Sequence, residues 1–136
     1  MPVKRLIATL EKLQEVYEEL CVLADRKKEA LIRNVADEVS AVTNRESKLS
    51  RRIGELLNEQ SEATADFFRS KGFHLARAVT VTELSRMVAE PEEKKALLAA
   101  RDRLAATVAE LKEKNELNRQ LLEQSLAFIN FSLNLL

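Results

Sequence analysis

The chain has 136 residues and no net charge, because 22 Lys and Arg residues balance 22 Asp and Glu residues. This balance excludes the basic stripe with which nucleic-acid-binding proteins neutralise phosphates, so no nucleic-acid partner is expected. Charged residues make up 32% of the chain and apolar residues 46%, with 2 Gly and 2 Pro. This composition is typical of long helices, and the length suits a single domain over residues 1–136.

The cysteine content and the first residues predict a cytoplasmic protein. A single cysteine, Cys21, excludes an intramolecular disulfide and fits a reducing compartment. The opening stretch MPVKRLIATLEK has no long apolar run behind its charges. Neither a signal peptide nor insertion into a membrane is therefore expected.

An apolar stripe with heptad spacing opens the chain. Its members are Leu6, Leu10, Leu13, Tyr17, Leu20, Ala24 and Leu31. Lys27 interrupts the stripe, and beyond Leu31 its phase slips before it resumes through Leu49 and Leu56. This slip is a coiled-coil stutter, which does not have to break a helix. The pattern predicts a first helix over about residues 3–71, with or without a kink.

Two start signals divide the rest of the chain. Thr80 and Glu83 have the spacing of a capping box, which predicts a short helix over about residues 81–89. Pro91 suits the first turn of a last helix over about residues 91–136. The predicted fold class is all-α: a long helix, a short helix and a long helix, packed as an antiparallel hairpin or coiled-coil-like bundle.

The predicted first helix ends near Gly72. Gly72 suits the left-handed residue of a Schellman ending, with Phe73 contacting Phe68.

The two long helices differ in length, which leaves two arrangements open. At about 1.5 Å per residue, an unbroken first helix spans roughly 100 Å and the last helix roughly 70 Å. An unbroken helix would expose part of its stripe near the apolar end of the last helix: Leu6, Leu10, Leu13 and Tyr17. A break at the stutter or near Gly54 is the alternative.

One stripe of the last helix is expected to pack on the first helix, at about 100° per residue. It comprises Leu97, Leu104, Val108, Leu111, Leu122, Leu126, Ile129, Leu133 and Leu136. Asn115 and Asn118 fall inside the same stripe, where a polar residue costs stability and fixes register. A register role, or amides that reach water, is favoured over direct contact with a ligand.

A second face of the last helix, about 110° around it, changes from charged to apolar near residue 117. From there it carries Leu117, Leu121, Phe128, Phe131 and Leu135. A helix that is apolar on two sides needs cover on both. Another part of the chain, a second copy in a homodimer or a different protein could supply it, and the residues favour none of the three. A membrane surface fits less well, because no Lys or Arg follows Arg119.

No set of residues suggests catalysis or a cofactor. His74 lies in a predicted loop, without a second His or Cys beside it to build a metal site. Cys21 is expected to be a small buried hydrophobe. Glu46 lies close to the stripe, and a snorkelling acid is favoured there over a buried one. Neither enzymatic activity nor a cofactor is expected.

Two stretches carry a family resemblance. The predicted first helix contains an acid within TNRESKLSRRI, and the last helix contains NELNRQLLEQSLAFI, with Asn115, Asn118 and Leu122 before an apolar end. With a break in between, this layout resembles the FlgN family of cytoplasmic flagellar export chaperones. The resemblance implies binding to the hook–filament junction proteins FlgK and FlgL. It also implies capping of their terminal amphipathic segments, prevention of premature assembly, and delivery to the type III export gate through FlhA.

The resemblance also suggests where a client would bind. An amphipathic segment that folds into a groove is helix-in-groove recognition. The apolar second face is the predicted client surface: Leu117, Leu121, Phe128, Phe131 and Leu135. Three further residues are predicted to fix register or contact the partner: Asn115, Asn118 and Leu122. The alternative is a structural coiled-coil protein that homodimerises through the same residues and has no export client.

Overall fold

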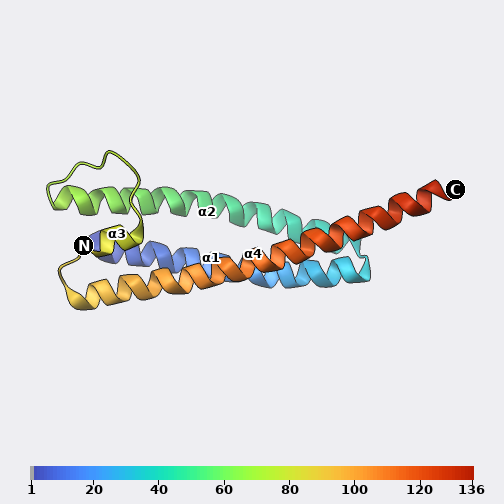
Figure 1. Cartoon of the computed structure of the whole chain (residues 1–136), viewed down its shortest axis with the longest axis horizontal. Coiled ribbons are helices and arrows are strands. Elements are labelled where there is room, and N and C mark those ends of the chain that lie inside the picture. Colours follow the sequence, from blue (N-terminus) through green and yellow to red (C-terminus); the bar gives the residue numbers. More distant parts are fainter. Residues whose placement is uncertain (1) are drawn as a thin grey trace.

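The computed structural model describes residues 2–136, and of Pro2 only the backbone. It contains four helices: α1 (Pro2–Arg33), α2 (Ala36–Ser70), α3 (Val81–Ser85) and α4 (Pro91–Asn134). Residues 2–136 contain no strand, so the all-α prediction is confirmed. In Figure 1 the three long helices lie side by side with α1 in the middle. Both α2 and α4 pack along α1 rather than along each other.

The predicted helix over residues 3–71 is two helices that fold back on each other. The break lies at the stutter, as the alternative arrangement required, and Asn34 takes a left-handed backbone with φ 60°. The amide of Val35 donates to the carbonyl of Ala30 at 2.9 Å, and the amide of Asn34 to that of Leu31 at 3.3 Å. These bonds form a Schellman ending, in which Asn replaces the usual Gly because its short polar side chain tolerates the left-handed region.

Folding back at Asn34 gives the stripe of α1 a partner. Leu6, Leu10 and Leu13 would be exposed in an unbroken helix, but they are 0%, 2% and 1% exposed. They pack in one core with residues of α2, α3 and α4, among them Leu56, Phe67, Leu84 and Leu97. A second core cluster lies further along α1 and includes Leu20, Ala24, Val42, Leu49 and Leu111. Because α1 lies between two helices, it is buried on both sides.

The predicted end of α2 is confirmed at Gly72. Gly72 has φ 84°, and its amide donates to the carbonyl of Arg69 at 3.0 Å. The amide of Phe73 donates to the carbonyl of Phe68 at 2.9 Å, which completes a second Schellman ending.

The helix starts are also confirmed. The Thr80 hydroxyl accepts the amide of Glu83 at 3.0 Å, and the Glu83 side chain returns to the Thr80 backbone, so the capping box is complete. α3 ends at Ser85 rather than near residue 89, because the chain continues there as a turn. Before α4, the Glu90 carboxylate accepts the amides of Glu92 and Glu93 and thereby caps the helix. No described helix is long and apolar enough to cross a membrane.

Candidate functional site

α4 is much longer than the helix that covers it. It has 44 residues against 32 in α1. Its last buried residue is Asn118, and its final turns project past both α1 and α2 (Figure 1). We call residues 119–136 the α4 tail. No side chain of the tail is buried.

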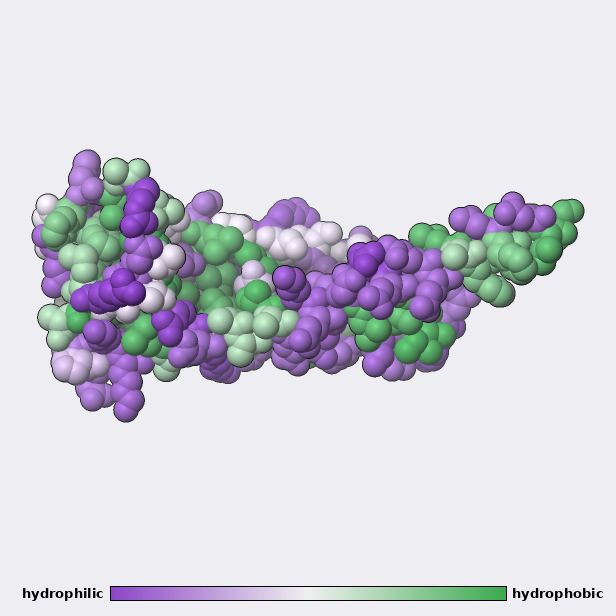
Figure 2. All heavy atoms as spheres, in the orientation of Figure 1, coloured by the Kyte–Doolittle hydropathy of each residue, from purple (hydrophilic) through white to green (hydrophobic). Residues whose placement is uncertain are grey.

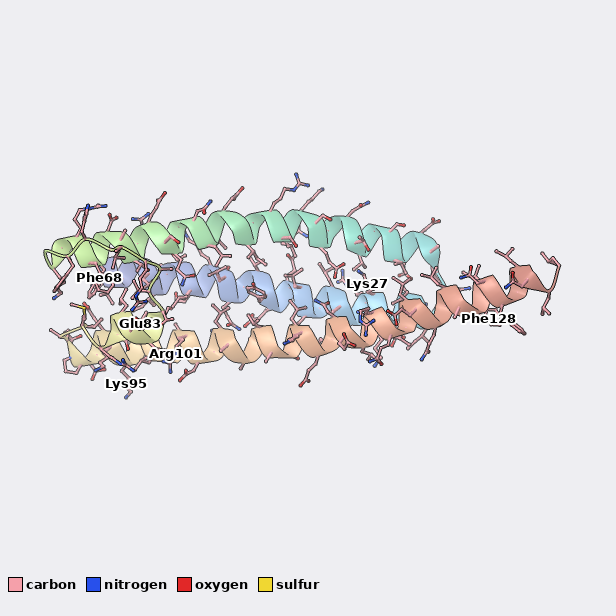
Figure 3. The ribbon with its side chains drawn as sticks, turned by 45° about the horizontal axis from the view of Figure 1, so that its top comes forward. Lys27, Phe68, Glu83, Lys95, Arg101 and Phe128 are labelled. Atoms are coloured by element: carbon pink, nitrogen blue, oxygen red, sulfur yellow. The ribbon has the colours of Figure 1, made fainter. Side chains whose placement is uncertain are left out.

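The tail is apolar as well as uncovered. Phe128 is 70% exposed, Phe131 62% and Leu135 72%. No charged residue follows Glu123. Figure 2 shows hydrophobic side chains gathered on the projecting end, and Figure 3 places Phe128 on it. Exposed apolar surface of this extent is typical of a protein-interaction site.

The part of α4 that packs on α1 follows a heptad row. Its buried and half-buried members are Leu97, Ala100, Leu104, Thr107, Leu111, Lys114, Asn118, Leu121 and Ser125. A straight helix of about 3.6 residues per turn drifts roughly 20° per heptad from such a row. The predicted stripe, which assumed about 3.6 residues per turn, therefore turns away from α1 toward the end of α4. Leu122, Leu126 and Ile129 were expected on the first helix, but they are 45%, 51% and 47% exposed.

Hydrogen bonds between α1 and α4 follow the same row. Gln14 Nε2 donates to Thr107 Oγ1 at 2.6 Å. Asn118 Nδ2 donates to the Ala24 carbonyl at 2.8 Å. Because each bond joins one position of α4 to one of α1, they favour a single register.

The two asparagines have different surroundings. Asn118 is 5% exposed and its Oδ1 has no hydrogen-bond partner, whereas Asn115 is exposed. Both line a groove of about 580 Å³ that runs over α1 between α2 and α4, together with Leu122. We call it the polar groove. The three residues predicted to fix register or contact a partner therefore lie in one place.

An ion pair lies within the polar groove. Lys27 Nζ, on α1, is 2.6 Å from Glu46 Oε1, on α2, and the two side chains are 22% and 18% exposed. Lys27 interrupts the apolar stripe of α1, and Glu46 lies close to the apolar stripe of α2. Their ion pair neutralises both charges at the contact between the two helices. Glu46 is thus partly buried and paired, where a snorkelling acid was expected.

The first residue of the predicted client surface, Leu117, is 41% exposed and lies before the tail, and the other four residues divide into two parts. Leu121 and Phe128 line a hollow of about 300 Å³ with Leu31 and Ile32, at the end of α1. The exposed side chains of Phe131 and Leu135 lie further along α4. The sequence interpretation missed Ile32, which is 58% exposed beside the tail. The only indication of it in the sequence is an apolar residue next to Leu31 but outside the heptad row.

A belt of charges lies on α4 before its uncharged end. Arg119 Nη2 donates to Glu116 Oε1 at 2.6 Å, and a second guanidinium nitrogen pairs with Glu123. The hydrogen bond from Arg119, together with one from Gln120, lowers the pKa of Glu116 to about 2. The hydrogen bond to Glu116, together with the negative charges of Glu116 and Glu123, raises the pKa of Arg119 above its usual range. Beyond Glu123, the last residue of this belt, the tail has no charged residue.

Cys21 and His74 lie where the sequence predicted. Cys21 is buried, with its Sγ 3.8 Å from the Thr107 carbonyl, and burial raises the pKa of the thiol. His74 is exposed in the loop after α2. Within residues 2–136 no three His, Cys, Asp or Glu residues are grouped to hold a metal ion.

Residues 2–136 thus form an all-α bundle in which three long helices pack together and the end of one of them carries an uncovered apolar surface. The family model for the FlgN protein matches residues 1–136, so the chain belongs to the FlgN family. FlgN proteins are flagellar export chaperones, a class without enzymatic activity, and membership supports a flagellar chaperone role. The chain is also 28% identical over 136 residues to "Uncharacterized protein YvyG" of Bacillus subtilis (strain 168), covering 100% of this chain and 81% of the relative. No solved structure matches the sequence.

Proposed function

We propose that this chain is a cytoplasmic export chaperone for the hook–filament junction proteins FlgK and FlgL. It binds their terminal amphipathic helices, prevents premature assembly, and delivers them to the type III export gate through FlhA. The exposed apolar surface of the α4 tail, in a chain of the FlgN family, is the observation that supports this function.

The apolar surface of the predicted client site allows a specific complex but does not by itself set the affinity. Burying five large side chains contributes about 8–15 kcal/mol in total, at about 1.5–3 kcal/mol each. Association costs roughly 4–15 kcal/mol, and micromolar affinity needs a net gain of about 8 kcal/mol, so the packing of the client helix decides how tightly it binds. The apolar face of an amphipathic helix is the natural cover for such a surface, and its polar face then remains in water.

The polar groove would continue the client site toward the core. Leu122 belongs both to the tail and to the lining of the groove, while Asn115 faces the groove with an exposed amide. A client helix that reaches the groove would meet the Asn115 amide as a polar partner. Asn118 is bonded to α1, so its contribution is to hold α4 in register.

Calorimetric titration with the C-terminal segment of FlgK or FlgL tests the proposal. We expect binding at micromolar concentration or tighter, with a negative heat-capacity change from apolar burial. A triple variant, Phe128→Ser, Phe131→Ser and Leu135→Ser, should abolish it. These positions are chosen because Leu121 and Leu117 lie closer to the α1 seam, where a change also affects stability.

A matched triple variant provides the control. Leu57→Ser, Phe73→Ser and Leu75→Ser remove three apolar side chains that are 48%, 54% and 37% exposed elsewhere on the molecule. This control should bind the client as the unmodified chain does, and circular dichroism should show unchanged helix content in both variants. Equal binding by both triple variants would remove the tail from consideration. Absence of client binding, with a dimer that dissociates in the tail variant, would support the structural homodimer instead.

A further inference from the structure

The α4 tail carries a second apolar row beside the predicted client surface. The row consists of Leu122, Leu126, Ile129, Leu133 and Leu136, and we call it the tail row. Its first four members are 45%, 51%, 47% and 60% exposed. The client surface lies about 110° around the helix, so a partner that covers one face leaves the other in water. The tail row therefore needs a cover of its own.

The spacing of the tail row suits an antiparallel copy of itself. Its members are 4, 3, 4 and 3 residues apart, which is the repeat of a coiled-coil seam. The first three steps, 4, 3 and 4, read the same in both directions. Two antiparallel copies of α4 can therefore place Leu122 opposite Leu133 of the second copy, and Leu126 opposite Ile129 of the second copy. A two-fold interface requires such a self-complementary surface.

The charges on α4 favour the antiparallel direction. Residues 124–136 contain no charged side chain. In the antiparallel alignment, Glu123 lies level with Ser132 of the second copy, and the Glu123 residues of the two copies are about 13 Å apart along the helix axis. A parallel alignment would place the two Glu123 residues, and the two Arg119 residues, at the same level, where like charges repel. The antiparallel pair avoids both contacts.

The end of the bundle leaves room for this alignment. The two-fold axis lies level with the peptide bond between Ala127 and Phe128. Ile32 and Asn34, at the end of α1, line one hollow together with Phe128, so the bundle ends near the level of the axis. Figure 1 shows α4 projecting beyond this end. Two copies therefore meet end to end, and only their tails overlap.

The tail of the second copy also reaches the polar groove. Its Leu136 lies level with Arg119, which belongs to the lining of the groove. The charged residues of the lining are paired within the chain, Lys27 with Glu46 and Arg119 with Glu116. An uncharged helix end can therefore enter the end of the groove without leaving a charge unpaired.

We propose that the tail row pairs with the tail row of a second copy of this chain in an antiparallel, two-fold dimer. The inference goes beyond the client site and does not depend on a client, and Leu122 is the one residue that both partners would share. Two helix ends bury less area than the roughly 1,200–2,000 Å² of a stable complex. The dimer therefore forms as the protein concentration rises, and the tail is open in dilute solution. The client surface remains exposed in both forms.

Sedimentation equilibrium of the full chain over a range of concentrations tests the pairing. The tail-row variant, Leu126→Ser with Ile129→Ser and Leu133→Ser, should raise the dissociation constant of the dimer at least about tenfold. The three side chains are exposed, so thermal unfolding in dilute solution should be unchanged.

The client-surface variant, Phe128→Ser with Phe131→Ser and Leu135→Ser, is the matched control on the same helix. It should dimerise as the unmodified chain does. Titration with the C-terminal segment of FlgK should give the reverse order, because the tail-row variant keeps the client surface and the control loses it. Failure of the dimer and failure of the client proposal are therefore distinguishable.

Disulfide cross-linking tests the alignment. The double variant Leu122→Cys with Leu133→Cys should form a disulfide-linked dimer under mild oxidation, because these two positions face each other across the axis. Either single variant should stay monomeric, since its two cysteines are then about 17 Å apart along the axis, beyond the roughly 7 Å between Cα atoms that a disulfide spans. The native thiol of Cys21 is buried, so the unmodified chain is the control.

Three results would overturn the inference. The chain could remain monomeric up to about 1 mM, which would leave the tail row to a different protein. The two triple variants could weaken the dimer equally. Single-cysteine variants that cross-link as readily as the double variant would exclude the antiparallel alignment.

Discussion

Both halves of α4 contain large apolar side chains, but these side chains have opposite surroundings in the two halves. In the first half, Leu97 is 0% exposed and Leu111 8%, because both pack on α1. In the second half, Leu126 is 51% exposed and Leu133 60%. The helix continues without a break from Pro91 to Asn134. The difference therefore comes from the partner, since α1 ends at Arg33.

The comparison shows that the turn at Asn34 sets the extent of the exposed surface. If α1 continued, it would offer α4 a longer partner and α2 would not fold back on it. Because α1 stops, α4 extends beyond its cover and keeps an apolar surface free for another molecule. A local backbone feature on one helix thus determines the interaction surface on another.

The largest expected effect separates the two halves directly. Leu97→Ala should lower the free energy of unfolding by about 2–5 kcal/mol, because it leaves a cavity in the core. Leu133→Ala should change it by less than about 0.5 kcal/mol, since this side chain is largely exposed. Urea unfolding followed by circular dichroism measures both. Similar losses at the two positions would mean that the tail is covered in solution.

The next prediction concerns the turn that ends the cover. Asn34→Ala should lower the free energy of unfolding by about 1–2 kcal/mol, because the Cβ of alanine is in steric conflict with the backbone in the left-handed region. Asn34→Gly is the matched control and should be close to neutral, since glycine adopts that region freely. Urea unfolding distinguishes them. An alanine variant as stable as the glycine variant would contradict the left-handed turn.

A smaller effect is expected at the boundary between the halves. Asn118→Ala should cost about 1 kcal/mol, because it removes the hydrogen bond to the Ala24 carbonyl. Asn115→Ala should leave stability unchanged and weaken client binding instead. Chemical unfolding and calorimetric titration of the two variants separate these roles. The interpretation fails if the Asn115 change destabilises the fold as much as the Asn118 change.

The smallest effect is a dependence on pH in the charged belt at the start of the tail. The pKa of Glu116 is lowered from 4.5 to about 2 by its hydrogen bond from Arg119. A lowered folded-state pKa contributes stability that is present above about pH 4.5 and is lost as the pH falls toward 2. Titration of the Glu116 carboxyl by nuclear magnetic resonance should show this shift. In the Arg119→Gln variant the pKa should return toward its usual value; an unchanged value would exclude Arg119 as the cause.

Signals confined to a few residues were predicted well from the sequence. The capping box at Thr80 and Glu83 and the Schellman ending at Gly72 both have their partners within one helical turn. The turn at Asn34 was harder, because asparagine tolerates the left-handed region without requiring it. Only the slipped phase of the apolar stripe indicated that place. Its use as a turn depends on the packing of α2 against α1.

The apolar tail was predicted from its residues, but its geometry was not. A helical wheel drawn at about 3.6 residues per turn placed Leu122 on α1. Helices that pack over several heptads repeat their contacts about every 3.5 residues, and this repeat places Leu121 and Ser125 against α1 instead. The pairing of Lys27 with Glu46 could not be predicted from the sequence either. Each residue lies on a different helix, and the contact exists only because the chain turns at Asn34.

Hydrogen–deuterium exchange of the chain, with and without the C-terminal segment of FlgK, tests the central claim most directly. Backbone amides of residues 97–118 should exchange slowly in both states, because that part of α4 packs on α1. Amides of the α4 tail should exchange quickly in the free chain and become protected when the segment binds. A tail that is already protected in the free chain, or one that stays unprotected with the segment bound, would contradict the proposal that the tail is an open client-binding surface.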